Sequence, residues 1–242
     1  MKLKVLGSSS KGNCYILEDE KNIVIIDCGI SYREILKGID FNLAKVKFAL
    51  SGHSHADHSK AIIDLMKNGV DVYVSKETAT ELNLSGYRLK IIKELKQFNV
   101  GEFMVLPFDL HHDVHTLGFI IQHKSLGKLI YATDTSYIEY KFSGLNHILI
   151  EANYSKEILE KNIENGFDPV RAERIVRSHF SLENVKELVK ANDNPKLKNV
   201  VLLHLSDGNS NAKEFKEQIH ELTNKAVYVA DKGLEIELGG TK

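Results

Sequence analysis

The chain of 242 residues contains no tryptophan, only two cysteines and only three prolines. Two cysteines are too few for a disulfide-stapled scaffold, so the fold must rest on a hydrophobic core. The hydrophobic fraction of 43% is ordinary for such a core. With no tryptophan and few other aromatics, an extended base-stacking surface for single-stranded nucleic acid is not indicated. We expect one globular domain over residues 1–242.

An excess of charge of one sign is also lacking. The formal net charge is −1, from 32 basic and 33 acidic residues mixed along the chain. This balance excludes a global electrostatic attraction for nucleic acid or for an anionic membrane. Any site for a polyanion must therefore be local.

Long hydrophobic runs are absent as well. The N-terminal segment Met1–Leu6 reaches Gly7 and Ser8 before an apolar stretch of signal-peptide length can form. No later run approaches the ~18 apolar residues expected of a membrane-spanning helix. We therefore expect a cytoplasmic protein with no membrane partner; the sequence does not give its oligomeric state.

The two cysteines fall in neighbouring predicted strands, 14–19 and 23–28, around a turn at Asp19-Glu20-Lys21-Asn22. This hairpin predicts that Cys14 and Cys28 face one another across the strands. In a reducing cytoplasm we expect free thiols that serve packing. The alternative is a redox switch, which requires a lowered thiol pKa.

Short apolar runs bounded by Gly, Asn, Asp or Ser predict a chain rich in strands. Helices are indicated where a capping residue precedes a helical pattern. The predicted strands are 2–6, 14–19, 23–28, 47–51, 71–75, 97–109, 116–123, 128–132, 146–151, 199–203, 226–230 and 234–238. The predicted helices are 60–66 after Ser59, one beginning at Asp168-Pro169, 182–191 after Ser181, and 212–222 after Ser210. Two sheet-rich halves, each with helices for an outer face, predict an α/β (α+β) fold built as a four-layer αββα sandwich.

The most specific signal is the segment Ser51–His58, which reads Ser-Gly-His-Ser-His-Ala-Asp-His. Its HxHxDH pattern places four metal-ligand side chains within six residues: His53, His55, Asp57 and His58. Imidazole nitrogens and carboxylates are the ligands of zinc, and also suit manganese. Because the segment lies between a strand and a helix, it can present side chains in two directions and so help to hold two ions. The alternative is a solvated histidine-rich loop.

A site for two ions needs further ligands, and three candidate places lie at the ends of later predicted strands. They are the segment 110–115, which contains His111, His112 and His115; Asp134, whose two oxygens can bridge two cations; and His204. A lone histidine after a strand is usually a surface or core residue. Together with HxHxDH these residues favour a metal centre.

The ordered set HxHxDH, His, Asp, His resembles the metallo-β-lactamase superfamily over nearly the whole chain. The chain is most similar to the YycJ/WalJ-like group of bacteria and phages, in segments 7–13, 112–114, 133–135, 151–153 and 204–206. The resemblance implies that His112, rather than His111 or His115, is the third histidine ligand. It also implies that Asp27, in the strand Val24–Gly29, supports the metal loop from behind the ligands. Tyr154 departs from the group, where many members have histidine.

Ser178-His179-Phe180-Ser181 is similar in position to a His-Ser-Thr segment of tRNase Z, a related nuclease. The resemblance implies that His179 contacts the scissile phosphate or protonates the leaving group; the alternative is a helix-capping or buried histidine. Upstream, Arg171, Arg174 and Arg177 share one side of a predicted helix and can offer guanidinium groups to a phosphodiester, Arg174 and Arg177 above all. Equally, they can form a solvated helix face.

The chemistry expected of two such cations, zinc or manganese, is hydrolysis by a metal-bridging hydroxide, with Asp57 as both ligand and orienting group. Asp134 favours phosphodiester substrates, because lactamases of the superfamily usually have a cysteine near that position. No insert between Asp134 and His204 is long enough for the extra domain of the β-CASP RNA-processing enzymes.

We therefore predict a metal-dependent nuclease that acts on DNA rather than RNA. The alternatives are a hydrolase of a small molecule, such as a cyclic nucleotide, phosphonate ester or thioester, and a non-catalytic binding module. His123, His147 and His220 are interpreted as structural or surface residues.

Overall fold

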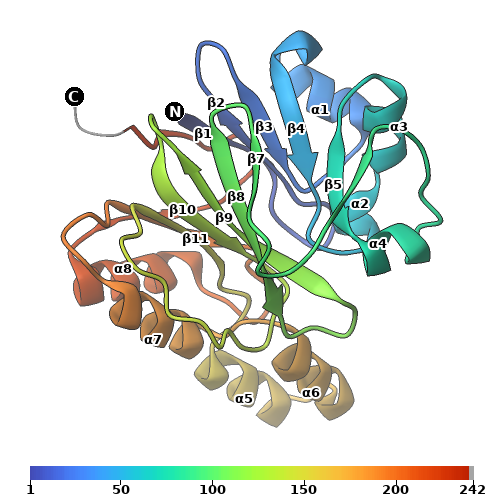
Figure 1. Cartoon of the computed structure of the whole chain (residues 1–242). Coiled ribbons are helices and arrows are strands. Elements are labelled where there is room, and N and C mark those ends of the chain that lie inside the picture. The colour runs from blue at the N-terminus through green and yellow to red at the C-terminus, as the bar shows by residue number, and fades with distance from the viewer. Residues whose placement is uncertain (240–242) are drawn as a thin grey trace.

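Two seven-stranded sheets lie face to face in the computed structural model, which describes residues 1–239 (Figure 1). In spatial order the first sheet contains β14 (Glu235–Glu237), β1 (Lys2–Gly7), β2 (Cys14–Glu18), β3 (Ile23–Ile26), β4 (Val46–Leu50), β5 (Val72–Ser75) and β6 (Leu89–Ile92). The second contains β13 (Ala226–Val229), β12 (Asn199–Leu203), β11 (His147–Glu151), β10 (Gly127–Ala132), β9 (Thr116–His123), β8 (Phe103–Leu110) and β7 (Phe98–Val100).

Alternation along each strand divides the apolar side chains between an inner and an outer surface. In β2, Tyr15 and Leu17 belong to the cluster between the sheets, whereas Cys14 and Ile16 belong to the cluster under the outer helices. Phe119 and Tyr131 extend the inner cluster from the second sheet. Strands that are buried on both faces account for the nearly continuous apolar runs in the sequence.

Helices cover both outer faces (Figure 1). On the first sheet, buried residues of α1 (Tyr32–Gly38), α3 (Ile62–Lys67) and α4 (Lys76–Glu81) join the outer cluster. On the second, α7 (Leu182–Asn192) and α8 (Ala212–Thr223) do the same. The remaining helices are α2 (Ala56–Ser59), the short 3-10 helix Leu43–Lys45, α5 (Lys156–Glu164) and α6 (Pro169–Ser178). The predicted αββα sandwich is confirmed.

The sheet topology gathers several of the predicted site residues at one end. Strands β3 to β6 are parallel, and so are β10 to β13. The carboxyl ends of parallel strands share one edge of a sheet, and ligands commonly bind there. Asp27, Asp134 and His204 follow β3, β10 and β12 closely, and all three adopt the left-handed backbone conformation, with φ between 52° and 58°. Such a residue turns the chain sharply, which places these polar side chains directly at the strand exits.

Several predicted boundaries were wrong. Ser59 does not cap a helix over 60–66; its hydroxyl donates to the carbonyls of Ser54 and His55, and α3 begins only at Ile62. The run 97–109 is a hairpin of β7 and β8, turned at Gly101 with φ 57°. The cap of α8 is Asn211 rather than Ser210, because the side chain of Asn211 accepts the N–H of Glu214.

Four α-helices (α1, α2, α4 and α5), the 3-10 helix Leu43–Lys45 and one strand were not predicted. Helices α1, α4 and α5 each begin after a serine whose side chain accepts a backbone N–H three residues later. Each has nine residues or fewer, too short for a clear helical period in the sequence. The unpredicted strand, β6, is a half-exposed strand at the edge of the first sheet.

The cysteine hairpin forms, but one residue out of the predicted register. Tyr15 faces Ile26 and Glu18 faces Ile23, so Cys28 lies beyond the end of β3 and is not the direct partner of Cys14. Both are buried free thiols in the outer cluster of the first sheet. Burial raises the pKa of each thiol well above its usual value. These observations favour the packing role over the redox switch.

Within residues 1–239, no helix has both the length and the apolar character needed to cross a bilayer.

The buried thiols lead to a reactivity prediction. Because both side chains are fully buried and their thiolate forms are disfavoured, we expect Ellman's reagent to label neither cysteine in the folded protein within minutes. In guanidinium chloride both should react. Rapid labelling of a thiol in the native state would contradict the packing role and favour redox chemistry.

Candidate metal centre

The HxHxDH loop leaves β4 and turns into α2, which holds the four predicted ligands in two groups. His53 precedes the helix, and His55 is its N-cap residue. Asp57 and His58 lie in the single turn of α2, so their side chains leave the loop in other directions. Ser51 fixes the loop from inside, because its hydroxyl lies within hydrogen-bond distance of the carbonyls of His53 and His58.

His53 is fully buried, yet neither of its ring nitrogens has a hydrogen-bond partner in the described chain. An unsatisfied buried polar atom costs about 1–3 kcal/mol. Burial and the neighbouring His58 lower the pKa of His53 well below its usual value, so the ring is neutral and one nitrogen keeps a free lone pair. A buried lone pair without a donor is what a metal ligand presents.

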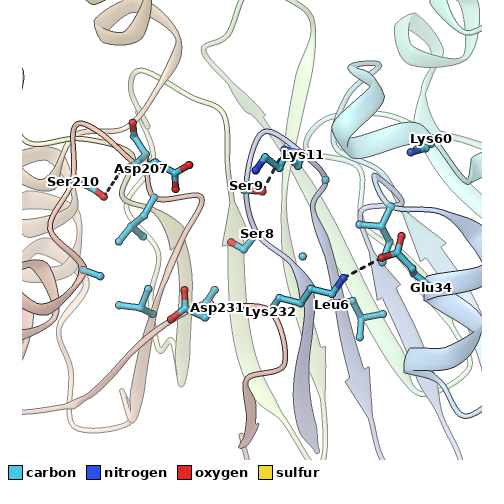
Figure 2. A pocket seen from close by; sticks show the side chains of 18 residues that line it. Leu6, Ser8, Ser9, Lys11, Glu34, Lys60, Asp207, Ser210, Asp231 and Lys232 are labelled. Atoms are coloured by element: carbon cyan, nitrogen blue, oxygen red, sulfur yellow. Dashed lines mark hydrogen bonds and ion pairs between the residues drawn. The ribbon is translucent and has the colours of Figure 1, made fainter.

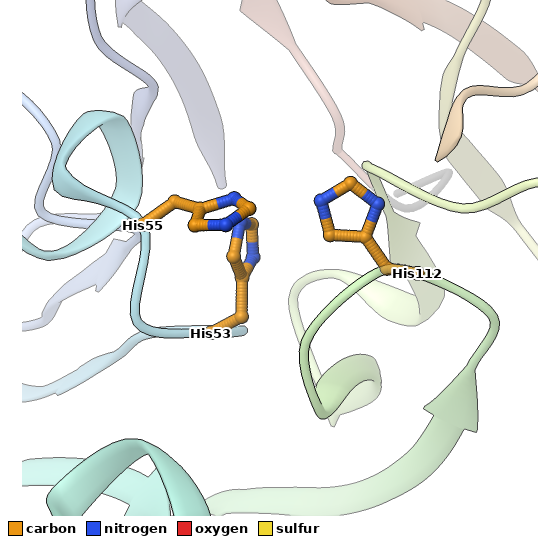
Figure 3. Close-up of side chains that lie close together, drawn as sticks. All are labelled: His53, His55 and His112. Atoms are coloured by element: carbon orange, nitrogen blue, oxygen red, sulfur yellow. The ribbon is translucent and has the colours of Figure 1, made fainter. Parts of the chain in front are cut away.

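His53, His55 and His112 form the first group of donors, and one nitrogen from each lies within 4.8 Å of the others. Figure 3 shows His112 facing the other two from the opposite side of a gap. Nδ1 of His112 lies 3.0 Å from the carbonyl oxygen of Ser178, which can only accept, so this nitrogen carries the proton. Nε2 is then left as an acceptor toward the gap. Asp113 Oδ1 lies beside it, 3.0 Å from His112 Nε2 and 3.6 Å from His55 Nε2.

His58 is held from behind by Asp27. Nδ1 of His58 lies 2.6 Å from Asp27 Oδ2, and both side chains are fully buried. The carboxylate also accepts the N–H of Gly52 at 2.9 Å and the hydroxyl of Tyr131. Since the carboxylate accepts the Nδ1 proton, Nε2 of His58 faces the centre as a candidate donor atom, an arrangement that is common behind metal-binding histidines.

Asp134 connects the donor groups. Its Oδ2 lies 2.6 Å from His58 Nε2 but has no hydrogen bond of acceptable geometry among the described residues. Its Oδ1 lies 3.1 Å from His204 Nδ1 and 3.2 Å from His179 Nδ1. Burial alone would raise the pKa of Asp134, but the facing histidines His204 and His58 lower it well below the usual value. The side chain is therefore an anion with one oxygen toward each neighbouring group.

Glu151 organises the far side of the centre. This fully buried carboxylate ends β11, and its Oε1 lies 2.7 Å from His179 Nδ1 and 3.1 Å from His204 Nδ1. Its Oε2 accepts the backbone N–H groups of Thr135 and Phe180. Asp134, Glu151, His179 and His204 form a second group of donors within 4.8 Å of one another, and His53, His58 and Asp134 form a third. The three groups are joined through His53 and Asp134.

Asp57 lies at the margin of these groups. Its Oδ2 is 3.5 Å from His58 Nε2, and its side chain is 26% exposed, so it borders the centre from the solvent side. Asn13, which is buried, lies between them, with Nδ2 2.9 Å from His58 Nε2 and 3.4 Å from Asp57 Oδ2. The backbone N–H of Asn13 also donates to the carbonyl of Asp57 at 2.7 Å.

Glycines allow this close approach. A Cβ on Gly29 would lie 1.6 Å from the carbonyl oxygen of Asp57. A Cβ on Gly12 would lie 2.7 Å from the carbonyl oxygen of Gly29, and one on Gly7 would lie 2.4 Å from that of Gly12. The N-terminal loop, the turn after β3 and the metal loop therefore stack backbone against backbone. This contact gives a physical reason for a glycine two residues after Asp27.

Three other residues singled out in the sequence, His111, His115 and Tyr154, belong to no donor group. His111 points to Glu139, and His115 lies nearest to Glu77 and Asp109, so neither belongs to a donor group. Tyr154 is buried beside Leu159 and Ala172, and burial raises its pKa to about 12.

His179 is both the C-cap of α6 and part of a hollow next to the centre, so the functional and capping interpretations are compatible. Arg171 and Arg174 line the same hollow, and the guanidinium of Arg171 stacks on Phe167. Arg177 lines a different hollow, beside His112, and is paired with Glu173.

Sequence reasoning assigned no role to Asn13, Asp113 or Glu151. All three stand in segments quoted for the family resemblance, which was the one available signal. Asn13 and Glu151 make their contacts across the fold, so no local spacing could reveal them. Asp113 lies next to His112 in the sequence and also approaches His55.

The donor set and the strand-exit geometry agree with the family comparison. Residues 22–205 match the β-lactamase superfamily domain. The chain belongs to this superfamily. The exodeoxyribonuclease WalJ of Streptococcus pneumoniae serotype 2 (strain D39) is 26% identical over 254 residues, which cover 98% of this chain and 91% of that protein. The predicted resemblance to the WalJ-like group is confirmed.

Solved structures of the superfamily share the fold. The Bacillus subtilis metallo-β-lactamase fold protein YhfI superimposes with a TM-score of 0.74 at 16% identity, covering 98% of this chain and 99% of YhfI. The short form of human tRNase Z gives a TM-score of 0.69 at 15% identity, with coverage of 99% and 100%. At these identities the likeness concerns the fold alone. A superfamily member with these donor groups is suited to divalent metals.

The glycine contact leads to a test of the metal loop. In Gly29→Ala the new methyl group must displace the Asp57 carbonyl, so we expect the free energy of unfolding to fall by about 1–3 kcal/mol. Bound zinc, measured by elemental analysis after loading and desalting, should fall as well.

The matched control is Gly239→Ala, where no atom lies within 4 Å of the added Cβ. If Gly29→Ala kept full zinc content and stability, the close packing of the metal loop would not be a constraint.

Proposed function

We propose that this protein is a metal-dependent nuclease that hydrolyses phosphodiester bonds of DNA, using two divalent cations, zinc or manganese. The observation that carries the proposal is the chain of three donor groups joined through His53 and Asp134. Within these groups, the ring nitrogens of His53 and the Oδ2 atom of Asp134 are buried and have no hydrogen-bond partner in the described chain. A cation can bind to these atoms. We further propose that residues 1–242 work as one domain.

The residues proposed to hold the cations are those predicted from the sequence. His53, His55 and His112 would hold one cation, and Asp57, His58 and His204 the other, with Asp134 between them. When bound, such cations supply a water made acidic enough to act as a nucleophile near neutral pH, and they neutralise charge on the phosphate. Asp57, next to both His58 and the solvent, is placed to orient the incoming water.

We assign to His179 the role of general acid. Burial alone would lower its pKa, but the carboxylates of Glu151 and Asp134 raise the pKa of His179 to about 10. Its imidazole therefore carries a proton at neutral pH, ready for the leaving oxygen. The ring lines a hollow of about 560 Å³ together with His204, Arg171 and Arg174. In that hollow Arg174 can donate to a phosphate as the new P–O bond forms and the old one breaks.

The choice of DNA rests on the WalJ relative, which is named an exodeoxyribonuclease, and which spans almost the whole chain. Asp134 at the junction of the donor groups supports a phosphodiester over a β-lactam. Because the chain as a whole is nearly neutral, a site for a polyanion needs positive charge close by. Arg171 and Arg174, beside His179, supply that charge.

The proposal is tested by cleavage of end-labelled single- and double-stranded DNA and RNA with zinc or manganese. We expect DNA to be cut, and Asp134→Asn to lower kcat by at least about 10³-fold because the buried anion between the donor groups is lost. Chelation with EDTA should abolish cutting, and re-addition of metal should restore it.

Lys124→Gln, on an exposed side chain paired with Glu102, is the control for general effects of substitution. Hydrolysis of bis(p-nitrophenyl) phosphate without any cleavage of DNA or RNA would overturn the nuclease proposal and favour a small-molecule phosphodiesterase.

Glu151 gives a separate prediction about proton transfer. In Glu151→Gln, the carboxylate that raises the pKa of His179 most is removed, so that pKa should fall toward its usual value near 6.5. His179 would then lose its proton at a lower pH, and the alkaline limb of the kcat/KM profile should move to lower pH. At pH 8 a group with a pKa near 6.5 is only about 3% protonated, so we expect kcat to drop by up to about 30-fold, close to the lower end of the range for loss of a general acid.

The His179→Gln variant should show a similar loss in kcat without the shifted limb. An unchanged pH profile in Glu151→Gln would show that Glu151 does not control the proton on His179.

A further inference from the structure

A second hollow, of about 570 Å³, adjoins the hollow that contains His179 and His204. We call the hollow that contains His179 and His204 the catalytic hollow, and the hollow of about 570 Å³ the adjacent hollow. Four residues line both of them: Ser9, Leu205, Ser206 and Asp207. The two spaces are thus separated by the tip of the N-terminal loop and by the residues that directly follow His204. A chain-like ligand with one unit in the catalytic hollow can place its next unit in the adjacent one.

The N-terminal loop, Ser8–Gly12, straddles this boundary. Ser10 lines the catalytic hollow, Ser8 and Lys11 line the adjacent hollow, and Ser9 lines both. The loop is tied to the metal centre, because Ser8 Oγ accepts the backbone N–H of His204 at 2.9 Å. The same oxygen lies 2.7 Å from the hydroxyl of Tyr15, which donates to Asn13 Oδ1. These hydrogen bonds hold the loop in place, and its small polar side chains form the boundary between the two hollows.

The adjacent hollow has charges of opposite sign on its two sides (Figure 2). Lys11 and Lys60 lie on one side, Asp207 and Asp231 lie on the other, and Ser8 and Ser9 lie between them. Lys232 is neutralised by Glu34 at 3.0 Å. In the described chain the other four charged side chains form no ion pair within 4 Å, so they remain available to a ligand.

We propose that the adjacent hollow binds the nucleotide next to the scissile bond, with its phosphate toward Lys11 and Lys60 and its base edge toward Asp207 and Asp231. This inference rests on the proposed nuclease function and specifies where that substrate continues beyond the metal centre.

The chemistry of the two sides matches a nucleotide rather than a simple anion. Lysine ammonium groups and serine hydroxyls bind phosphate oxygens, whereas carboxylates accept hydrogen bonds from amino groups of bases such as the N2 amino group of guanine or the N4 amino group of cytosine. A hollow lined only for phosphate would gain nothing from Asp207 and Asp231, which would repel it. The volume lies within the ~300–1,000 Å³ typical of small-ligand pockets.

The test measures binding to the metal-loaded protein by calorimetry, with dGMP and 2-deoxyribose 5-phosphate as probes. We expect dGMP to bind more tightly, because only dGMP carries a base. Lys11→Gln and Lys60→Gln should each weaken both probes about tenfold, the loss expected for one charge-assisted hydrogen bond. Asp231→Asn should weaken dGMP and leave deoxyribose phosphate unchanged. Lys93→Gln, an exposed lysine that lines neither hollow, is the matched control.

Cleavage assays separate this inference from the proposed function. In Lys11→Gln and Lys60→Gln we expect the KM for an oligonucleotide to rise about tenfold, whereas the Lys93→Gln control should keep the KM of the intact protein. If dGMP affinity were the same in Lys11→Gln, Lys60→Gln and the intact protein, the nucleotide would bind elsewhere and the inference would be wrong even if DNA is cut. If the two lysine variants and Asp231→Asn behave as expected while no DNA is cut, the hollow binds a nucleotide and only the nuclease proposal fails.

Discussion

The buried carboxylate of Asp27 is the contact on which the rest of the centre depends. It accepts hydrogen bonds from Gly52, in the loop after β4 of the first sheet, from His58 in α2, and from Tyr131 in β10 of the second sheet. One side chain thus ties together the start of the HxHxDH loop, the ring of His58 and a strand of the second sheet. A buried anion is tolerated only when donors surround it, and this one has three. Its left-handed backbone, at φ 58°, is the local strain that accompanies this placement.

The second constraint is steric rather than electrostatic. Gly7, Gly12 and Gly29 let three loops lie backbone against backbone, and this contact brings the N-terminal segment to the metal loop. The same contact positions Asn13 beside Asp57 and His58, and Ser8 beside His204. Residues that are first in the chain therefore share a site with residues that are almost last. The proposed nuclease and the proposed nucleotide hollow both depend on this arrangement.

The sequence was informative where chemistry is encoded in local spacing. HxHxDH identified the metal loop, and the alternation of runs and caps was enough for the αββα sandwich. Prediction failed where a side chain had two possible partners. The hydroxyl of Ser59 bonds back to Ser54 and His55 instead of capping a helix. Glu151 and Asn13 could not be predicted as site residues from local spacing. The histidine partners of Glu151 lie 28 and 53 positions away along the chain, and Asp57 and His58 lie 44 and 45 positions from Asn13.

Neither sheet contains a complete set of donors. The HxHxDH loop leaves the first sheet, whereas His112, Asp134, Glu151 and His204 leave the second. The centre therefore exists only where the two sheets meet, and its geometry is inherited from the apolar layer between them. A void opened at Phe119 or Leu17, which belong to the core and to none of the donor groups, would change the spacing of the donors without altering one of them. In this fold, affinity for a cation is also a measure of how tightly the core is packed.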